Sequence, residues 1–229
     1  MLENHQNFKP SKRQFVSGLY RKLPIGFVAL VDFLRSYHQC LYRDIPIFVH
    51  VPKNGGTSVA TSLYGKRILH VKVSSLNKFL KIFHLSNRTI FGLYRDPIDR
   101  FVSACNFLSH GGTSTVAMDY KNYYQNYDFE SLDSFIQMLT DIEHCKLDYV
   151  FQRQSEFLSS DFKIFSIDDI QDLQSLGIPI NTRFDKINSS VKKFMVEDLS
   201  AEQRFFLRDY YEQDYLFDNV VKRHGGALL

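Results

Sequence analysis

The stretch Ile45-Pro46-Ile47-Phe48-Val49-His50-Val51-Pro52-Lys53-Asn54-Gly55-Gly56-Thr57-Ser58 decides the fold that we expect for this chain. Its first seven residues form a short apolar run with β-branched side chains, which is typical of a strand buried on both faces. A turn with two glycines follows, and the pattern then predicts a helix to about Tyr64. A buried strand that leads through a tight turn into a helix is the basic unit of an α/β sheet.

Three further apolar runs, Arg67–Val71, Thr89–Tyr94 and Phe162–Ile167, are also predicted strands, and helical stretches follow the first two. Strands that alternate with helices of about 10–15 residues indicate a parallel sheet with right-handed crossovers. At about 100–200 residues per domain, the length of 229 residues suits one α/β domain, to which we assign residues 45–229.

Residues 1–44 are expected to form a basic helical extension, with helices near 11–22 and 25–40. Near the other end, Ser200-Ala201-Glu202-Gln203 is a capping-box pattern, in which a serine hydroxyl and a glutamine side chain satisfy each other's backbone donors. This pattern opens a predicted long amphipathic helix that continues beyond Val220.

The charge of the chain is uneven. The net charge is +3, from 28 Lys and Arg against 25 Asp and Glu, but residues 1–43 alone carry seven basic and two acidic residues. The rest of the chain therefore has a net charge of −2, which argues against a nucleic-acid binder, because such proteins have a basic face. The basic segment 1–43 can be a solvated helical lid, or it can contact an anionic substrate or the anionic surface of a membrane.

The cysteines and the hydropathy of the chain suggest an intracellular protein. Cys40, Cys105 and Cys145 are odd in number and lack the C-x-x-C spacing of zinc sites, so we expect neither a disulfide framework nor a metal. The most apolar early run, residues 23–34, is too short for a membrane span of about 20 residues and contains Asp32. We expect a cytoplasmic protein, with peripheral contact at the inner membrane through residues 1–43 as an option.

The segment from Lys53 to Ser58 has the features of an anion cradle. Glycines between a strand and a helix allow the backbone N–H groups to point at one place, and the helix N-terminus adds partial positive charge. Thr57 and Ser58 add hydroxyl groups, and Lys53 stands before the glycines, from where it can reach an anion from the side. In the G-x-x-x-x-G-K-S/T loop of nucleotide triphosphatases the lysine follows the last glycine, so the reversed order disfavours Mg-ATP chemistry. A Gly-Gly turn can also be an ordinary connector.

A second anion-binding segment is predicted where Phe91–Tyr94 ends. Arg95 at this strand end can present a planar pair of donors to a phosphate, and Pro97 suits the first position of a helix. Ser103, two turns into that helix, can add a hydroxyl group. The alternative is a surface ion pair between Arg95 and Asp99 beside a helical serine without function.

Together, Pro52-Lys53-x-Gly-Gly-Thr-Ser and Arg95-Asp-Pro-x-x-Arg-x-x-Ser resemble the motifs of sulfotransferases that use 3′-phosphoadenosine 5′-phosphosulfate (PAPS). The likeness is to the carbohydrate branch, which includes heparan 2-O and chondroitin enzymes and many bacterial members, and it covers roughly residues 45–220. It implies a P-loop-like three-layer fold, with a central parallel sheet flanked by helices. It also implies transfer of a sulfuryl group from PAPS to a hydroxyl of a glycan or glycolipid without a metal.

The resemblance assigns roles to residues of this chain. The 5′-phosphosulfate would be held by the residues of the first motif, which are Lys53, Asn54, Gly55, Gly56, Thr57 and Ser58. The 3′-phosphate would be held by Arg95 and Ser103. Residues 151–158 resemble the family's Pro-Gln-x-x-aromatic-Leu helix, although Arg153 stands where proline is usual. Residues 187–190 and the pattern Tyr211-x-x-Asp214-x-x-Phe217 also look like family features.

The best candidate for a general base is His70, at the end of the second predicted strand, because relatives use histidine or glutamate in this role. The alternatives are that His70 is a hydrogen-bonded structural histidine and that a carboxylate such as Glu156 is the base. His50 is expected to be a buried strand residue. The polar, aromatic segment from Gly111 to Tyr127 can bind the acceptor or can be a variable surface loop.

Two other functions remain open from the sequence. One is a nucleotide or small-molecule kinase on a similar sheet, although the order of lysine and glycines and the lack of an obvious magnesium-binding aspartate count against it. The other is a non-catalytic nucleotide-binding or scaffold protein that keeps the cradle and lacks the base.

Overall fold

The computed structural model describes residues 24–110, 112, 127–176 and 192–225. Its centre is a three-stranded parallel sheet with strands β1 (Ile47–Val49), β2 (Ile90–Tyr94) and β3 (Lys163–Ser166) in the order β1-β2-β3. Phe48 lies opposite Phe91, and Gly92 lies opposite Ile164. Helices flank this sheet, so the predicted α/β class with a parallel sheet is confirmed.

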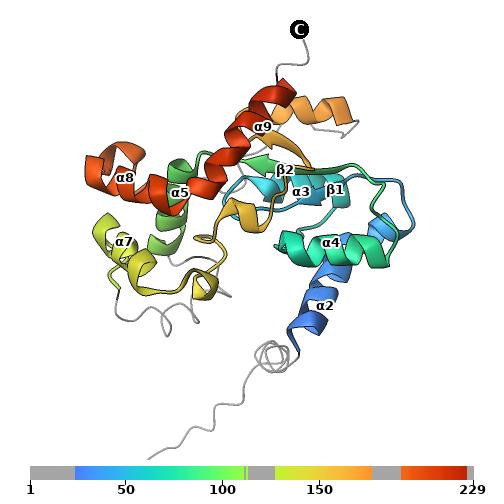
Figure 1. The fold of residues 1–229 in the computed structure, drawn as a ribbon, viewed down its shortest axis with the longest axis horizontal. Coiled ribbons are helices and arrows are strands. Elements are labelled where there is room, and N and C mark those ends of the chain that lie inside the picture. The colour runs from blue at the N-terminus through green and yellow to red at the C-terminus, as the bar shows by residue number, and fades with distance from the viewer. Residues whose placement is uncertain (1–23, 111, 113–126, 177–191, 226–229) are drawn as a thin grey trace, which may run out of the picture.

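The helices of the described residues surround this sheet and extend beyond one end of it (Figure 1). They are α2 (Ile25–Tyr37), α3 (Gly56–Tyr64), α4 (Val73–Ile82), α5 (Pro97–Ser109), α7 (Leu132–Asp141), α8 (Ala201–Tyr210) and α9 (Leu216–Gly225). Short 3₁₀ turns lie at His38–Leu41, His144–Lys146, Gln154–Glu156, Ile170–Leu176, Val196–Asp198 and Glu212–Tyr215. Helix α2 packs on α4, α9 packs on β3, and α5 packs on α8. None of the helices in this part of the chain is long and apolar enough to cross a membrane.

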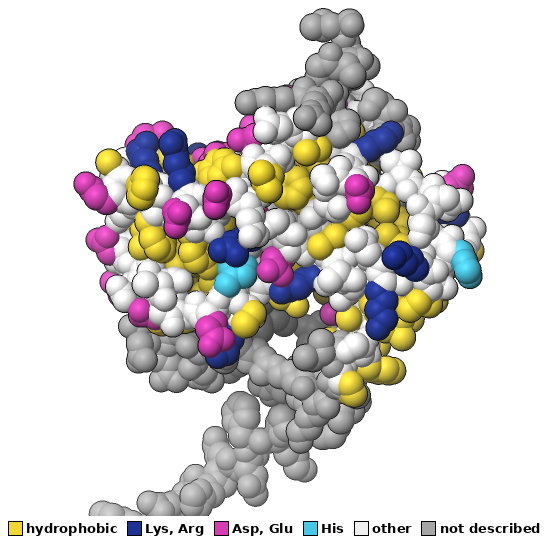
Figure 2. Space-filling model, in the orientation of Figure 1, with side chains coloured by type: hydrophobic (Ala, Val, Ile, Leu, Met, Phe, Trp, Pro, Cys, Tyr) yellow, Lys and Arg dark blue, Asp and Glu magenta, His cyan; other side chains and the backbone are white. Residues whose placement is uncertain are grey.

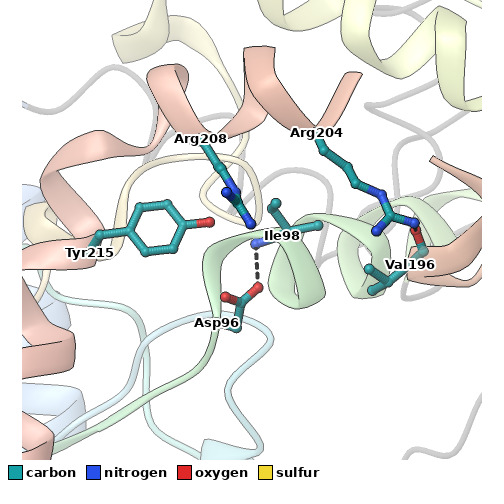
Figure 3. A pocket seen from close by; sticks show the side chains of 6 residues that line it. All are labelled: Asp96, Ile98, Val196, Arg204, Arg208 and Tyr215. Carbon is teal, nitrogen blue, oxygen red and sulfur yellow. Dashed lines mark hydrogen bonds between the residues drawn. The ribbon is translucent and has the colours of Figure 1, made fainter. Parts of the chain in front are cut away.

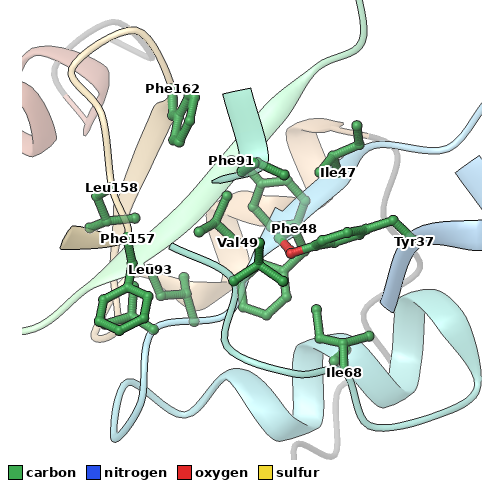
Figure 4. Close-up of a cluster of buried hydrophobic side chains, with 14 of the residues drawn as sticks. Tyr37, Ile47, Phe48, Val49, Ile68, Phe91, Leu93, Phe157, Leu158 and Phe162 are labelled. Carbon is green, nitrogen blue, oxygen red and sulfur yellow. The ribbon is translucent and has the colours of Figure 1, made fainter. Parts of the chain in front are cut away.

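The buried side chains form two hydrophobic clusters. The first surrounds the sheet and includes Phe48, Val49, Phe91 and Leu93, as Figure 4 shows. The second lies among α5, α7 and α8 and includes Phe135, which is fully buried. The near-continuous apolarity of β1 and β2 thus reflects burial on both faces, as expected for a parallel sheet, whereas β3 is only partly buried.

The prediction of a strand at Arg67–Val71 is wrong, because this segment forms no ladder with β1. Two tyrosines already occupy the backbone groups of β1: the Tyr37 hydroxyl donates to Phe48 O at 3.0 Å, and the Tyr64 hydroxyl accepts from Phe48 N at 2.8 Å. The segment buries Ile68 and Val71, whereas Leu69 is exposed. Its backbone bonds to side chains instead; the Leu69 N–H, for example, donates to a serine hydroxyl. Side chains therefore protect this edge of the sheet.

The predicted long C-terminal helix is broken. The capping box at Ser200 and Gln203 is confirmed, but α8 ends at Tyr210, and a 3₁₀ turn precedes α9. Two side chains beside this break point into the protein: the Tyr211 hydroxyl donates to Phe151 O at 2.9 Å, and Asp214 is fully buried.

Other predicted elements are confirmed or lie outside the described residues. The helix expected at 25–40 is α2 with the 3₁₀ turn after it. Residues 151–158 form a turn and a short 3₁₀ helix rather than the expected α-helix, because the Asp214 carboxylate accepts the N–H groups of Gln154 and Ser155. The helix expected at 11–22, residues 187–190 and most of the loop 111–127 lie outside the part that the structure describes.

Candidate functional site

The loop between β1 and α3, residues 50–55, is called the cradle loop below. Gly55 has a φ of 69°, and Lys53 has a φ of 68°, so both lie in the left-handed region. A non-glycine residue rarely adopts this conformation, so its occurrence at Lys53 marks local backbone strain of about 1–3 kcal/mol. Among the described residues, the N–H groups of residues 55–58 make no hydrogen bond. These free donors at the start of α3 can bind an anion.

Gly56 allows α3 to begin directly on the sheet. A β-carbon at this position would lie 2.3 Å from His50 Cδ2 and 2.9 Å from Phe48 Cζ. Both of these side chains are buried, so neither has room to move away. The second glycine of the motif is therefore required by packing as well as by the turn.

Lys53 extends from the cradle loop across α5. Its Nζ lies 4.3 Å from the centre of the Phe107 ring, whose negative face stabilises the ammonium group. Burial, together with the positive charges of Arg95 and Arg100, lowers the pKa of Lys53 to about 8. No carboxylate within the described residues pairs with Lys53, so its charge is available to a bound anion.

The structure brings the two predicted motifs together. Arg95 follows β2, and its Nη1 donates to Lys53 O in the cradle loop at 3.2 Å. Asp96 then caps α5 by accepting the N–H groups of Ile98 and Asp99 at 2.9 and 3.0 Å. Asp99 forms no ion pair with Arg95. Burial lowers the pKa of Arg95, and the negative charge of Asp99 opposes this shift.

The other predicted side chains of the motifs differ in how they are placed. Ser103 lies half-buried on α5, and Thr57 and Ser58 lie in the first turn of α3; their hydroxyl groups make no hydrogen bond within the described part of the chain. The Asn54 side chain points inward, where Nδ2 donates to Leu93 O at 2.7 Å. Asn54 therefore anchors the cradle loop to the sheet with its side chain.

Arg100 is a buried support that sequence reasoning missed. It is 1% exposed, and its guanidinium donates to Pro52 O at 2.9 Å, to Gln152 O at 2.8 Å and to Tyr149 O at 3.2 Å. Its three acceptors are backbone carbonyls, so one arginine ties the cradle loop to the segment before β3. The sequence placed Arg100 in the second motif, but no local pattern indicated that this charged residue is buried.

His70 lies beside the cradle loop. Its Nδ1 is 2.8 Å from His50 O, its ring centre is 4.2 Å from that of His50, and His50 in turn packs under Gly56. Because Nδ1 faces a carbonyl acceptor, it carries the hydrogen, and Nε2 keeps its lone pair. Burial lowers the pKa of His70, and it lowers the pKa of His50 to about 3, with the charge of His70 as the second cause. Both rings are therefore neutral at pH 7.

Glu156, the other candidate base, lies in a charged cluster. Its Oε2 is 3.0 Å from Lys72 Nζ, and its Oε1 is 3.6 Å from His144 Nε2. His144 Nδ1 is in turn 2.9 Å from the Tyr210 hydroxyl. Figure 2 shows positive, negative and histidine side chains together near the middle of the visible face. One oxygen of the Glu156 carboxylate is thus already engaged by a lysine.

A pocket of about 390 Å³ lies beside the start of α5. It is lined by Asp96, Ile98, Val196, Arg204, Arg208 and Tyr215 (Figure 3). Arg204 donates to the carbonyl groups of Leu199 and Val196, whereas the buried Tyr215 hydroxyl finds no hydrogen-bond partner in the described part of the chain. The sequence did not predict this pocket, because residues 96–98, 196–208 and 215 meet only in the folded chain.

In the described residues, no three histidine, cysteine, aspartate or glutamate side chains are placed to hold a metal ion. Cys40, Cys105 and Cys145 are free thiols, and the first two are buried. Comparison of the chain with protein-family models, with curated proteins and with solved structures found no match. The roles proposed below therefore rest on the residues and contacts described above.

Proposed function

We propose that this chain is a sulfotransferase, which moves the sulfuryl group of PAPS to a hydroxyl of a glycan or glycolipid on a P-loop-like three-layer fold. One observation carries the proposal: Arg95 Nη1 donates a hydrogen bond to Lys53 O, so the two segments that we propose to bind anions are in direct contact. A donor with phosphate groups on both its 3′ and 5′ positions needs two such sites, whereas a simple nucleotide needs one. Lys53 and the free N–H groups of residues 55–58 supply the first site.

In the proposed reaction, the acceptor oxygen forms a bond to sulfur while the bond from sulfur to the 5′-phosphate oxygen breaks. The products are the sulfated acceptor and 3′,5′-ADP. Lys53 and the N–H groups at the start of α3 would stabilise the negative charge that develops on the leaving phosphate. His70 Nε2 would take the proton of the attacking hydroxyl, since Nδ1 is already engaged by His50 O.

The binding specificity tests this proposal directly. Thermal unfolding of the chain is measured with 3′,5′-ADP and, separately, with Mg-ATP. A ligand at 100 times its Kd adds about 2.7 kcal/mol to the free energy of unfolding, which raises the Tm by roughly 5–10 °C for a chain of this size. We expect this shift with 3′,5′-ADP. A shift with Mg-ATP alone would favour the kinase alternative, and a shift with neither ligand would refute nucleotide binding.

Two matched pairs of variants test the roles of the cations. Lys53→Ala should abolish the shift with 3′,5′-ADP, whereas Lys78→Ala, at an exposed position on α4, should leave it unchanged. Arg95→Ala should remove the preference for 3′,5′-ADP over 5′-AMP, whereas Arg67→Ala, also at an exposed position, should keep it. An unchanged preference in Arg95→Ala would show that Arg95 does not hold the 3′-phosphate.

A third pair of variants separates the two candidate bases. His70→Ala should abolish transfer from labelled PAPS in an acceptor screen and should keep binding of 3′,5′-ADP. Glu156→Gln should keep most of the turnover, because Glu156 is paired with Lys72. Normal turnover in His70→Ala, combined with loss of turnover in Glu156→Gln, would move the role of base to the carboxylate. Binding of 3′,5′-ADP without turnover by the unaltered chain would favour the non-catalytic alternative.

A further inference from the structure

The side-chain amide of Gln154 joins the two anion-binding motifs inside the protein. Its Nε2 donates to Arg95 O at 2.8 Å, and its Oε1 accepts from Arg95 N at 3.2 Å and from Asn54 Nδ2 at 2.6 Å. Gln154 is fully buried. One glutamine therefore pairs with both backbone groups of Arg95, as a neighbouring strand would, and holds the cradle loop at the same time.

Asp214 holds the backbone from which the Gln154 side chain projects. Its Oδ2 accepts the Gln154 N–H at 2.8 Å, and its Oδ1 accepts the Ser155 N–H at 2.9 Å. Asp214 is fully buried and comes from the 3₁₀ turn between α8 and α9. Hydrogen bonds to a carboxylate are roughly twice as strong as those between neutral groups, so this contact restrains Gln154 strongly.

Further contacts close the connection between the motifs. The Asn54 amide also donates to Leu93 O of β2 at 2.7 Å, and Arg95 Nη1 donates back to Lys53 O at 3.2 Å. The cradle loop and the end of β2 are thus linked at several points, and the Gln154 side chain bonds to both. A change in this side chain should shift the two motifs relative to each other without removing any group that contacts the ligand.

We propose that Gln154, held by Asp214, is a positioning residue that sets the separation of the two anion sites. It thereby selects a nucleotide with phosphates on both its 3′ and 5′ positions over a nucleotide with one phosphate. This inference rests on the proposed function, because it takes the two motifs as the sites of the two phosphates. A ligand with two anionic groups gains affinity only when both sites can be occupied at once, so it is sensitive to their separation. A ligand with one phosphate occupies one site, so its affinity does not depend on the separation of the two sites.

The test measures the binding of 3′,5′-ADP and 5′-AMP to the full chain by calorimetry. In Gln154→Met, we expect the preference for 3′,5′-ADP over 5′-AMP to fall about tenfold, while the affinity for 5′-AMP changes less than about threefold. The matched control is Gln152→Met. Gln152 is also buried, at 1% exposed, but its side chain donates to Leu147 O at 2.7 Å and makes no hydrogen bond to the described residues of either motif. The preference of Gln152→Met for 3′,5′-ADP over 5′-AMP should stay within about twofold of that of the unaltered chain.

Two milder variants keep the test decisive if Gln154→Met does not fold. Gln154→Glu keeps the shape of the side chain and loses the donor to Arg95 O, and Asp214→Asn loses one of two acceptors. Each should lower the preference by about threefold or more. The inference is overturned if the Gln154 variants lose stability but keep the preference, as expected for Gln152→Met. If the unaltered chain binds no 3′,5′-ADP, the proposed function fails, and the inference fails with it.

Discussion

Protonation of His50 is expected to destabilise the fold between pH 7 and pH 5. The His50 ring is 7% exposed, lies between Phe48 and the start of α3, and has its Nδ1 3.2 Å from Ile68 O. Burial is the main cause that lowers its pKa from 6.5 to about 3, and the charge of His70 is the second. In the folded chain, a positive charge on this ring would lie between the sheet and the cradle loop without water to solvate it.

The sign and size of the effect follow from the two pKa values. The unfolded chain binds the proton near pH 6.5, whereas the folded chain binds it near pH 3, so stability is complete above pH 6.5 and is lost as the pH falls. At pH 5 the unfolded histidine is almost fully protonated and the folded one is neutral. The gap of about 1.5 units below pH 6.5, at about 1.4 kcal/mol per unit, gives a loss of about 2 kcal/mol. The lowered pKa of His70 acts in the same direction.

Urea unfolding at pH 7 and at pH 5 measures this loss for the unaltered chain and for His50→Gln. The variant cannot titrate at this position. Between pH 7 and pH 5, its free energy of unfolding should therefore fall by about 2 kcal/mol less than that of the unaltered chain. A lower stability of the variant at pH 7 does not affect the comparison, which uses only the difference between the two pH values. His38→Gln, at an exposed histidine, serves as the control and should behave like the unaltered chain. Equal losses in His50→Gln and in the unaltered chain would refute the reasoning.

Four further predictions concern the core and the cradle loop. Gly56→Ala should lower the free energy of unfolding in urea by about 1–3 kcal/mol, because its β-carbon would lie 2.3 Å from a buried imidazole carbon. In the control Gly26→Ala the β-carbon meets nothing within 4 Å, so the free energy of unfolding should not fall. Tyr211→Phe, which removes a buried hydroxyl donor to a carbonyl 2.9 Å away, should cost about 1–3 kcal/mol in the same assay. Arg100→Lys should cost at least about 1–3 kcal/mol, since lysine cannot reach all three carbonyls in the geometry of the guanidinium. The affinity for 3′,5′-ADP, measured by calorimetry, should fall about tenfold per pH unit above about pH 8, where Lys53 loses its proton, and Lys53→Arg should remove this decrease. Unchanged stability in one of the first three variants would contradict the contact that it removes. An affinity that does not depend on pH would contradict the role of Lys53.

The elements that were predicted correctly are those whose signal is local. Each of β1, β2 and β3 lies within an apolar run, and the capping box at Ser200 is formed by residues three positions apart. The wrong strand at Arg67–Val71 has a similar local pattern. Its partner groups on β1 are taken by Tyr37 and Tyr64, which lie on two different helices, and no local pattern carries that information.

The candidate site divides in the same way. The residues proposed to contact the ligand, such as Lys53 and Arg95, stand out in the sequence because glycines, a strand end and a helix start surround them. The residues that hold the motifs together are Arg100, Gln154 and Asp214. Polar side chains of this kind are usually exposed, so their burial could not be inferred from residue type. The resemblance had marked the segments with Gln154 and Asp214, which was a signal for their position but not for their role.

The sequence by itself determined that this chain forms a parallel α/β sheet with a glycine turn after its first strand. Hydrophobic periodicity and glycine placement act over a few residues, and they are present in the unfolded chain. Only the tertiary structure decided that Arg95 reaches Lys53 O, that Gln154 lies between the two motifs and that His70 lies against His50. These contacts join residues 20 to 100 positions apart. They form only when burial of the apolar side chains forces the polar groups of distant segments to find partners inside the protein.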